Sequence, residues 1–246
     1  MQQEQFKYST GVVGFPILFV LIIWVVYWFE FRFGYDFNDW GVYPRTLEGL
    51  RGIVFSPFIH SDMEHLYHNT IPLFVLSAAL FYFYHKISWK IVIYGILLSG
   101  LLTWFIGRPA NHIGASGLIY VLMSFTLFKG VFSKHFRLIA LSLVVIFLYG
   151  SMIWYVFPVK EQMSWEGHLS GLIVGFVFAL YFRKSIAKPK RYEWEDENYN
   201  EEDDPFLRHF DENGNFIENP DGELSEESEA PATKITYHYK KKAKDS

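Results

Sequence analysis

The stretch Asn111-His-Ile-Gly-Ala-Ser-Gly-Leu-Ile-Tyr120 places Ser116 among small residues at the start of an apolar run. A hydroxyl held at such a position can act as a nucleophile below a membrane surface. Small residues around a serine also let membrane helices pack closely, with no chemical role for the hydroxyl. The local motif leaves both interpretations of Ser116 open, and the rest of the chain favours the first.

The composition of the chain indicates a membrane protein. Of the 246 residues, 51% are hydrophobic and 20% are aromatic, which is too apolar for an ordinary soluble domain with a tail. The apolar residues gather between Phe15 and Phe182 in runs long enough to cross a bilayer. Helices pair every backbone polar group internally, as the bilayer requires. The sequence therefore predicts an all-α polytopic membrane protein.

Six apolar runs predict six transmembrane helices, at 15–33, 65–84, 89–106, 116–128, 136–157 and 167–182. A full crossing needs roughly 20 residues, so the fourth and sixth helices are short. We expect their first turns to lie within the bilayer thickness, where water must reach them. The segment 34–62 is too polar to span and too aromatic to lie free in water, which predicts a first loop at the membrane interface.

The predicted domain organisation has three parts. Residues 1–14 precede the membrane domain at 15–182. The first apolar run lacks a convincing small-x-small cleavage site, so we expect it to be a retained helix and not a removed signal. Residues 183–246 are largely acidic and polar, with few residues to build a core, which predicts a disordered acidic tail. Within it, the stretch 205–210 could dock onto a partner. The chain has no cysteine, which excludes disulfides, a thiol nucleophile and cysteine-ligated metal.

Loop charges predict the orientation in the membrane. The formal net charge of −4 conceals an asymmetry, because acidic residues gather near the C-terminus. Basic residues fall mainly on one face of a six-span arrangement: Lys7, His85, Lys86, Lys90, Lys129, Lys134, Arg137, Arg183, Lys184, Lys188, Lys190 and Arg191. The positive-inside rule then predicts that both termini are cytoplasmic and that Ser116 and His168 enter from the outer face.

The last apolar run carries a candidate partner for the serine. His168, Gly171 and Gly175 are spaced by three and four residues, so they lie along one stripe of a helix. Glycines on that stripe let a neighbouring helix approach closely. If the neighbour is the fourth helix, which starts with Gly114, Ser116 and Gly117, the imidazole can remove the serine proton. The alternative is a helix-end histidine at the interface, but polar residues at membrane depth favour the catalytic interpretation.

Two further residues have the right chemistry for an oxyanion hole. His65 and Asn69 are four residues apart and share a helical face at the outer end of the second run. Their N–H groups, with the backbone amide of Ser116, could stabilise a tetrahedral intermediate. Alternatively they bond to an interfacial loop, as His60 and His68 are expected to do. Tyr120, one turn beyond Ser116, either packs on the imidazole or is an ordinary core residue.

A metal site is the competing use of the histidine-rich patch. His60, Glu64, His65 and His68 include helical spacings that could hold zinc. In metalloproteases a glutamate directly follows the first histidine of a His-Glu-x-x-His motif, and this order is absent here. We therefore expect no metal.

Together, three separated motifs resemble the six-helix bacterial form of the rhomboid intramembrane serine proteases. They are His60-(x4)-His65-(x3)-Asn69, Gly114-x-Ser116-Gly117 with Tyr120, and His168-(x2)-Gly171-(x3)-Gly175. The resemblance covers roughly 15–182. It implies that Ser116 is the nucleophile, that His168 is the general base and acid, and that His65, Asn69 and the Ser116 amide form the oxyanion hole.

The resemblance also implies an activity and a setting. We expect hydrolysis of a peptide bond in or near the transmembrane segment of another membrane protein, in the bacterial inner membrane, without a cofactor. The expected partners are transmembrane protein substrates and the lipid bilayer, and no nucleic acid. One alternative is a catalytically inactive relative that binds membrane proteins for quality control. Another is a transporter, whose usual mid-span charges and inverted repeats we do not find.

The first loop departs from the pattern of this family. Many relatives carry an adjacent Trp-Arg pair there, whereas this chain has Leu50-Arg51 with Trp40 upstream. The departure leaves the packing of the loop open and does not concern the serine and histidine.

Overall fold

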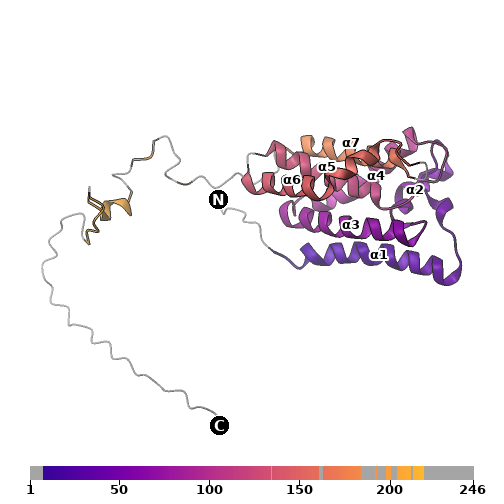
Figure 1. Ribbon diagram of the computed structural model, residues 1–246, viewed down its shortest axis with the longest axis horizontal. Helices are drawn as coiled ribbons and strands as arrows, with labels where there is room; N and C mark the ends of the chain where they lie inside the picture. Colours follow the sequence, from indigo (N-terminus) through magenta and orange to yellow (C-terminus); the bar gives the residue numbers. More distant parts are fainter. Residues whose placement is uncertain are drawn as a thin grey trace, which may run out of the picture. The chain divides into compact units, whose positions relative to one another are not determined.

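The structure is a computed structural model that describes residues 8–133, 135–160, 163–183, 192, 198–200, 204–211 and 213–218. The chain divides into two compact units, Met1–Lys190 and Arg191–Ser246. The first unit is a bundle of helices that run side by side (Figure 1).

Six long helices form this bundle and confirm the predicted all-α membrane architecture: α1 at Gly11–Phe33, α3 at Met63–Phe83, α4 at Ser88–Ile106, α5 at Ser116–Phe132, α6 at Phe136–Tyr149 and α7 at Trp165–Tyr181. The helix α6 continues as a 3-10 helix at Gly150–Val156. With that extension, α1, α3, α4 and α6 are long and apolar enough to cross a membrane. Many large apolar side chains point outward from the bundle, as contact with lipid requires.

The two short helices predicted from the sequence are present. Both α5 and α7 have 17 residues. At 1.5 Å per residue each is about 25 Å long, less than the roughly 30 Å hydrocarbon core of a bilayer. Their length therefore brings at least one end of each helix below the membrane surface.

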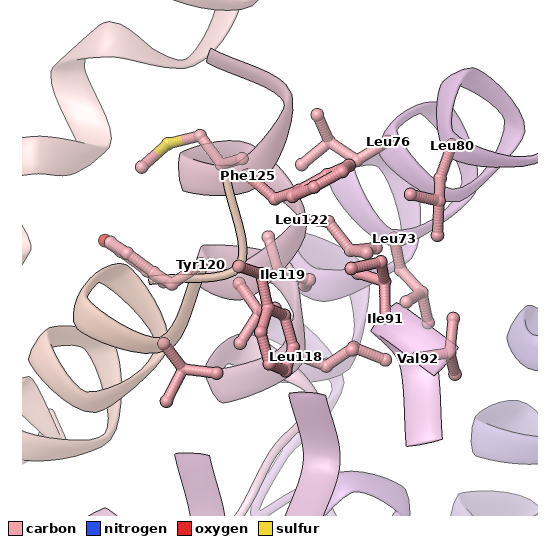
Figure 2. Packing of buried hydrophobic residues seen from close by; sticks show 14 of the residues in the cluster. Leu73, Leu76, Leu80, Ile91, Val92, Leu118, Ile119, Tyr120, Leu122 and Phe125 are labelled. Atoms are coloured by element: carbon pink, nitrogen blue, oxygen red, sulfur yellow. The ribbon is translucent and has the colours of Figure 1, made fainter. Parts of the chain in front are cut away.

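The central helix of the bundle is α5, which contacts α3, α4, α6 and α7. Every residue from Leu118 to Thr126 is buried, which fits a helix that is apolar on all sides. Figure 2 shows one side of this core, where α5 meets α3 and α4 through Leu118, Ile119, Leu122, Phe125, Leu73, Leu76, Leu80, Ile91 and Val92. At the edge of the bundle, α1 packs against α3 (Figure 1).

The C-terminal end of α5 at Phe132, which we call its inner end, differs from the boundary that the sequence predicted. The helix continues to Phe132, four residues past the predicted end at 128. Lys129, which we counted among the loop charges, is fully buried in the last turn, and its Nζ donates a hydrogen bond to the carbonyl oxygen of Phe182. That carbonyl lies at the end of α7, where the helix has no backbone donors left to pair it.

The first loop is built from short helical segments, at Asn38–Trp40, Glu48–Arg51, Gly52–Phe55 and Ser56–Phe58. The Arg51 guanidinium lies over the Trp40 ring, 5.1 Å from its centroid, and donates a hydrogen bond to the carbonyl of Asp39 at 3.0 Å. The tryptophan and arginine that are separated in sequence are thus paired in space.

In the second unit the described residues form a small turn. A 3-10 helix at Leu207–His209 precedes an isolated bridge between Phe210 and Phe216, and the Asp211 carboxylate accepts hydrogen bonds from the backbone amides of Asn213 and Asn215. The stretch 205–210, for which the sequence left docking onto a partner open, is part of this turn. Most of the residues predicted to be disordered, including the basic stretch 240–244, lie outside the described residues, as do residues 1–7.

Candidate active site

Ser116 is the first residue of α5, and a glycine shapes the turn before it. Gly114 has a φ of +103°, in the left-handed region that favours glycine. Its amide donates to the carbonyl of Ser56 at 2.8 Å, which ties the turn to the first loop. The helix therefore begins abruptly at Ser116, where backbone N–H groups have no partner within the helix. A negative charge is favoured at such a position.

Glycines bring α7 into contact with the start of α5. A Cβ added at Gly171 would collide with the carbonyl oxygen of Gly117 and would lie 2.7 Å from the Tyr120 Cβ. One turn further along, a Cβ at Gly175 would collide with the carbonyl oxygen of Val121. Because side chains larger than hydrogen do not fit, the two backbones are in direct contact along this stripe.

The contact brings His168 to the N-terminal end of α5 at Ser116, which we call its outer end. The imidazole is 6% exposed and stacks on the Tyr120 ring, with ring centroids 4.3 Å apart and an interplanar angle of 12°. Its Nδ1 lies 2.8 Å from the carbonyl oxygen of Tyr155. A carbonyl only accepts, so Nδ1 carries the hydrogen, and Nε2 of the neutral ring is left as a proton acceptor.

The structure brings Ser116 and His168 to neighbouring turns without a hydrogen bond between them. A Cβ at Gly117, next to the serine, would lie 3.8 Å from the carbonyl oxygen of Gly167, next to the histidine. The Ser116 hydroxyl makes no hydrogen bond to any part of the chain that the structure describes. In resting enzymes the bond between a nucleophile and its base is often long, and it shortens when substrate binds.

Two polar side chains, His65 and Asn69, converge on the turn before the serine. A Cβ at Gly114 would lie 2.5 Å from His65 Nε2 and 3.4 Å from Asn69 Nδ2. The Asn69 side chain is buried, and its Nδ2 has no hydrogen-bond partner among the described residues. His65 is held from the other side of its ring, where Nδ1 lies 3.3 Å from the Ser61 hydroxyl. The missing side chain of Gly114 thus leaves space beside the His65 imidazole and the Asn69 amide, next to Ser116.

The other two histidines of the patch, His60 and His68, lie in different surroundings. His60 is buried edge-on against the His65 ring, and its Nε2 accepts from the Ala115 amide at 3.5 Å. Burial, with a smaller contribution from nearby His65, lowers the pKa of His60 to about 3. His68 and Glu64 form an exposed pair, 3.5 Å apart. Within the described ranges, no group of three or more His, Asp or Glu side chains is close enough to hold a metal ion.

A small cavity of about 40 Å³ opens beside Ser116. Its polar lining includes Ser99 and Thr103 of α4 together with His112 and Ser164. A water molecule needs roughly 10–15 Å³ of such space and two to four polar partners. The cavity is therefore large and polar enough to hold water next to the serine hydroxyl.

Four polar residues around this site were not predicted from the sequence. His112 Nδ1 lies 2.6 Å from Ser164 Oγ, and Arg108 Nη1 lies 3.2 Å from the Oε2 of Glu166. Each pair joins residues more than fifty positions apart. The available signal was that polar residues stand at the outer ends of apolar runs, where buried polar groups need partners.

The comparison with known proteins identifies the family of this chain. A family model described as Rhomboid domain matches residues 48–185, more than half of the chain. An uncharacterized protein of Mycobacterium tuberculosis is 38% identical over 183 residues, which cover 68% of this chain and 74% of that protein. An uncharacterized protein of Mycobacterium leprae is 33% identical over 185 residues, which cover 68% of this chain and 70% of that protein. The chain belongs to the rhomboid family, which includes serine proteases.

The family match confirms the resemblance drawn from the three motifs. It begins in the first loop and ends just after α7, so it includes all the residues gathered around Ser116. The first helix, α1, and the C-terminal unit lie outside it.

Proposed function

We propose that this protein is an intramembrane serine endopeptidase that cleaves peptide bonds in or near the transmembrane segments of other membrane proteins. The observation that carries the proposal is the convergence of groups at the start of α5. A hydroxyl without a hydrogen bond to the described residues, a histidine with Nε2 available and an unpaired buried amide meet around the glycine turn. Buried polar groups are normally paired, so unpaired ones gathered at one place favour a substrate-binding role.

The proposed reaction is acyl transfer in two steps. Ser116 Oγ attacks the substrate carbonyl while His168 Nε2 accepts the hydroxyl proton. The oxyanion accepts hydrogen bonds from His65, Asn69 and the Ser116 amide. The tetrahedral intermediate then expels the amine, which takes the proton from His168, and a water molecule hydrolyses the acyl-enzyme. The Tyr155 carbonyl fixes the tautomer and orientation of the base, as the third member of a triad does elsewhere.

The substrate must expose its backbone to this site. A transmembrane helix hides its carbonyl groups in internal hydrogen bonds, so the segment to be cleaved has to unwind first. Small or helix-breaking residues near the cleavage site lower the cost of unwinding. The chemistry needs water but no cofactor, and the cavity beside Ser116 is suited to supply it. The enzyme lies in the bacterial inner membrane, with both termini in the cytoplasm and the site open to the outer face.

A fluorophosphonate probe tests this proposal against an inactive membrane-protein-binding relative. We expect the probe to label the wild-type protein and to leave Ser116→Ala unlabelled. His168→Ala should be labelled far more slowly, because the serine loses its base. A folded wild-type protein that is not labelled would favour the inactive relative. Equal labelling of His168→Ala would contradict the dyad.

A further inference from the structure

A buried carboxylate that the proposed reaction does not use lies two residues before His168. Glu166 is 1% exposed, in the first turn of α7. Its Oε1 accepts from the Arg108 amide at 3.1 Å, and its Oε2 lies 3.2 Å from Arg108 Nη1. Arg108 Nη2 also donates to the carbonyl of Met163 at 2.9 Å. Burying a carboxylate is unfavourable unless it is paired and hydrogen-bonded, and the N-terminus of α7 favours it further.

A second link lies beside the ion pair. His112 Nε2 lies 3.0 Å from the Arg108 carbonyl, which can only accept, so Nε2 carries the hydrogen in the neutral ring. Its Nδ1 then accepts from the Ser164 hydroxyl at 2.6 Å. Ser164 Oγ in turn accepts from the Gly167 amide at 3.2 Å, which caps the start of α7. Each donor in this series of three hydrogen bonds has one acceptor.

Both links join the same two segments. Arg108 and His112 belong to the connection 107–115, which ends at Ser116, whereas Ser164 and Glu166 immediately precede His168. The opposite side of the connection is paired with the first loop through the amides and carbonyls of Val42 and His112. The connection is therefore held on the first turn of α7, and we call these two links the outer clamp.

We propose that Glu166, paired with Arg108, is a positioning residue that sets the separation between the Ser116 hydroxyl and the His168 imidazole. The inference rests on the proposed function. The glycine contact fixes how closely α5 and α7 approach, but packed helices can still slide by small amounts along their axes. The outer clamp fixes that offset at the end where the two reacting groups lie. Glu166 itself is buried in the clamp, and its carboxylate is hydrogen-bonded to Arg108.

The test compares Glu166→Gln, Arg108→Gln and their double variant with wild type, and Glu48→Gln, an exposed acid of the first loop, is the matched control. A displacement of about 1 Å can reduce a rate by about 10²-fold. We expect each clamp variant to lose about that much in kcat on a transmembrane substrate and in the rate of fluorophosphonate labelling, with KM little changed. The double variant should lose no more than either single one, because both act through one contact. Each rate is divided by the fraction of protein that is folded, which thermal unfolding measures.

Two results would overturn the clamp: labelling of folded Glu166→Gln at the wild-type rate, or losses that multiply in the double variant. A wild-type protein that is never labelled refutes the proposed function instead. In that case a distance measurement tests the clamp independently of activity. Spin labels are attached to Pro109→Cys and Lys160→Cys, two exposed positions in the two segments that the clamp joins. The chain has no other cysteine that could be labelled. The distance distribution should broaden in Glu166→Gln, and an unchanged distribution refutes the clamp.

Discussion

The two ends of α5 each carry a polar residue, and the two residues differ in their hydrogen bonds. At the inner end, Lys129 is completely buried and its ammonium group is bonded to the last turn of α7. At the outer end, Ser116 is partly exposed to a polar cavity and has no hydrogen bond to the described residues. A buried polar group that is hydrogen-bonded stabilises the fold, whereas a hydroxyl beside a polar cavity is accessible to a further partner. The comparison suggests a test that separates a structural role of Lys129 from the proposed catalytic role of Ser116.

The largest effect should come from an oxyanion-hole donor at the outer end. Asn69→Ala removes the unpaired Nδ2 and should lower kcat by about 10²–10³-fold, the usual cost of losing one such donor. Because that nitrogen has no partner among the described residues, the free energy of unfolding should hardly change. Cleavage kinetics and thermal unfolding of the same preparations check both parts. A variant that loses stability but keeps its kcat would assign Asn69 to the fold.

The sequence predicted the helices and the face of α7 that meets α5 because both leave local signals. Apolar run length gave the spans, and the three-and-four spacing of His168, Gly171 and Gly175 gave the face of α7 that meets α5. It did not predict that Lys129 is buried inside α5, because a lysine after an apolar run looks the same whether it ends the helix or bonds to a distant carbonyl. The partner of Glu166 was also hidden, since Arg108 lies 58 residues away and pairing at that distance has no sequence period.

The next-largest effect should come from the contact between the glycines of α7 and the backbone of α5. Gly171→Ala places a methyl group against the Gly117 carbonyl, so α5 and α7 must separate. We expect about 1–3 kcal/mol of lost stability from overpacking and about 10²-fold lower activity per folded molecule from the displaced histidine. The matched control is Gly14→Ala in α1, where an added Cβ meets nothing within 4 Å. That change should leave activity intact and raise stability slightly, because alanine favours helix. Full activity of Gly171→Ala would show that the close contact is dispensable.

A substitution at the inner end of α5 should change the free energy of unfolding and leave the labelling rate of Ser116 unchanged. Lys129→Met removes the hydrogen bond that Lys129 Nζ donates to the carbonyl of Phe182 and should cost about 1–3 kcal/mol in the free energy of unfolding. The labelling rate of Ser116 per folded molecule should match wild type, since the change lies at the opposite end of α5. The control is Lys90→Met at an exposed position of α4, which should change stability by less than about 0.5 kcal/mol. Slow labelling of folded Lys129→Met would remove the distinction between the two ends.

The smallest expected effect is a pH dependence of stability to which buried histidines near the outer end contribute. Burial lowers the pKa of His112, and burial with the nearby His65 lowers the pKa of His60 to about 3. Both bind protons less readily when folded than in the unfolded chain, which takes them up below about pH 6.5. Their contribution is therefore complete above pH 6.5 and is lost as the pH falls, for His60 down to about pH 3, by at most about 1.4 kcal/mol per pH unit for each group.

Thermal unfolding of detergent-solubilised protein at pH 7.5 and pH 5 measures this dependence. The loss between the two pH values should shrink in His60→Gln, which cannot take up the proton in either state. His68→Gln is the control, because its imidazole is exposed on the outer surface of α3 and should leave the wild-type dependence in place. An equal loss in wild type and His60→Gln would mean that the buried histidines of the outer end do not bind protons on unfolding.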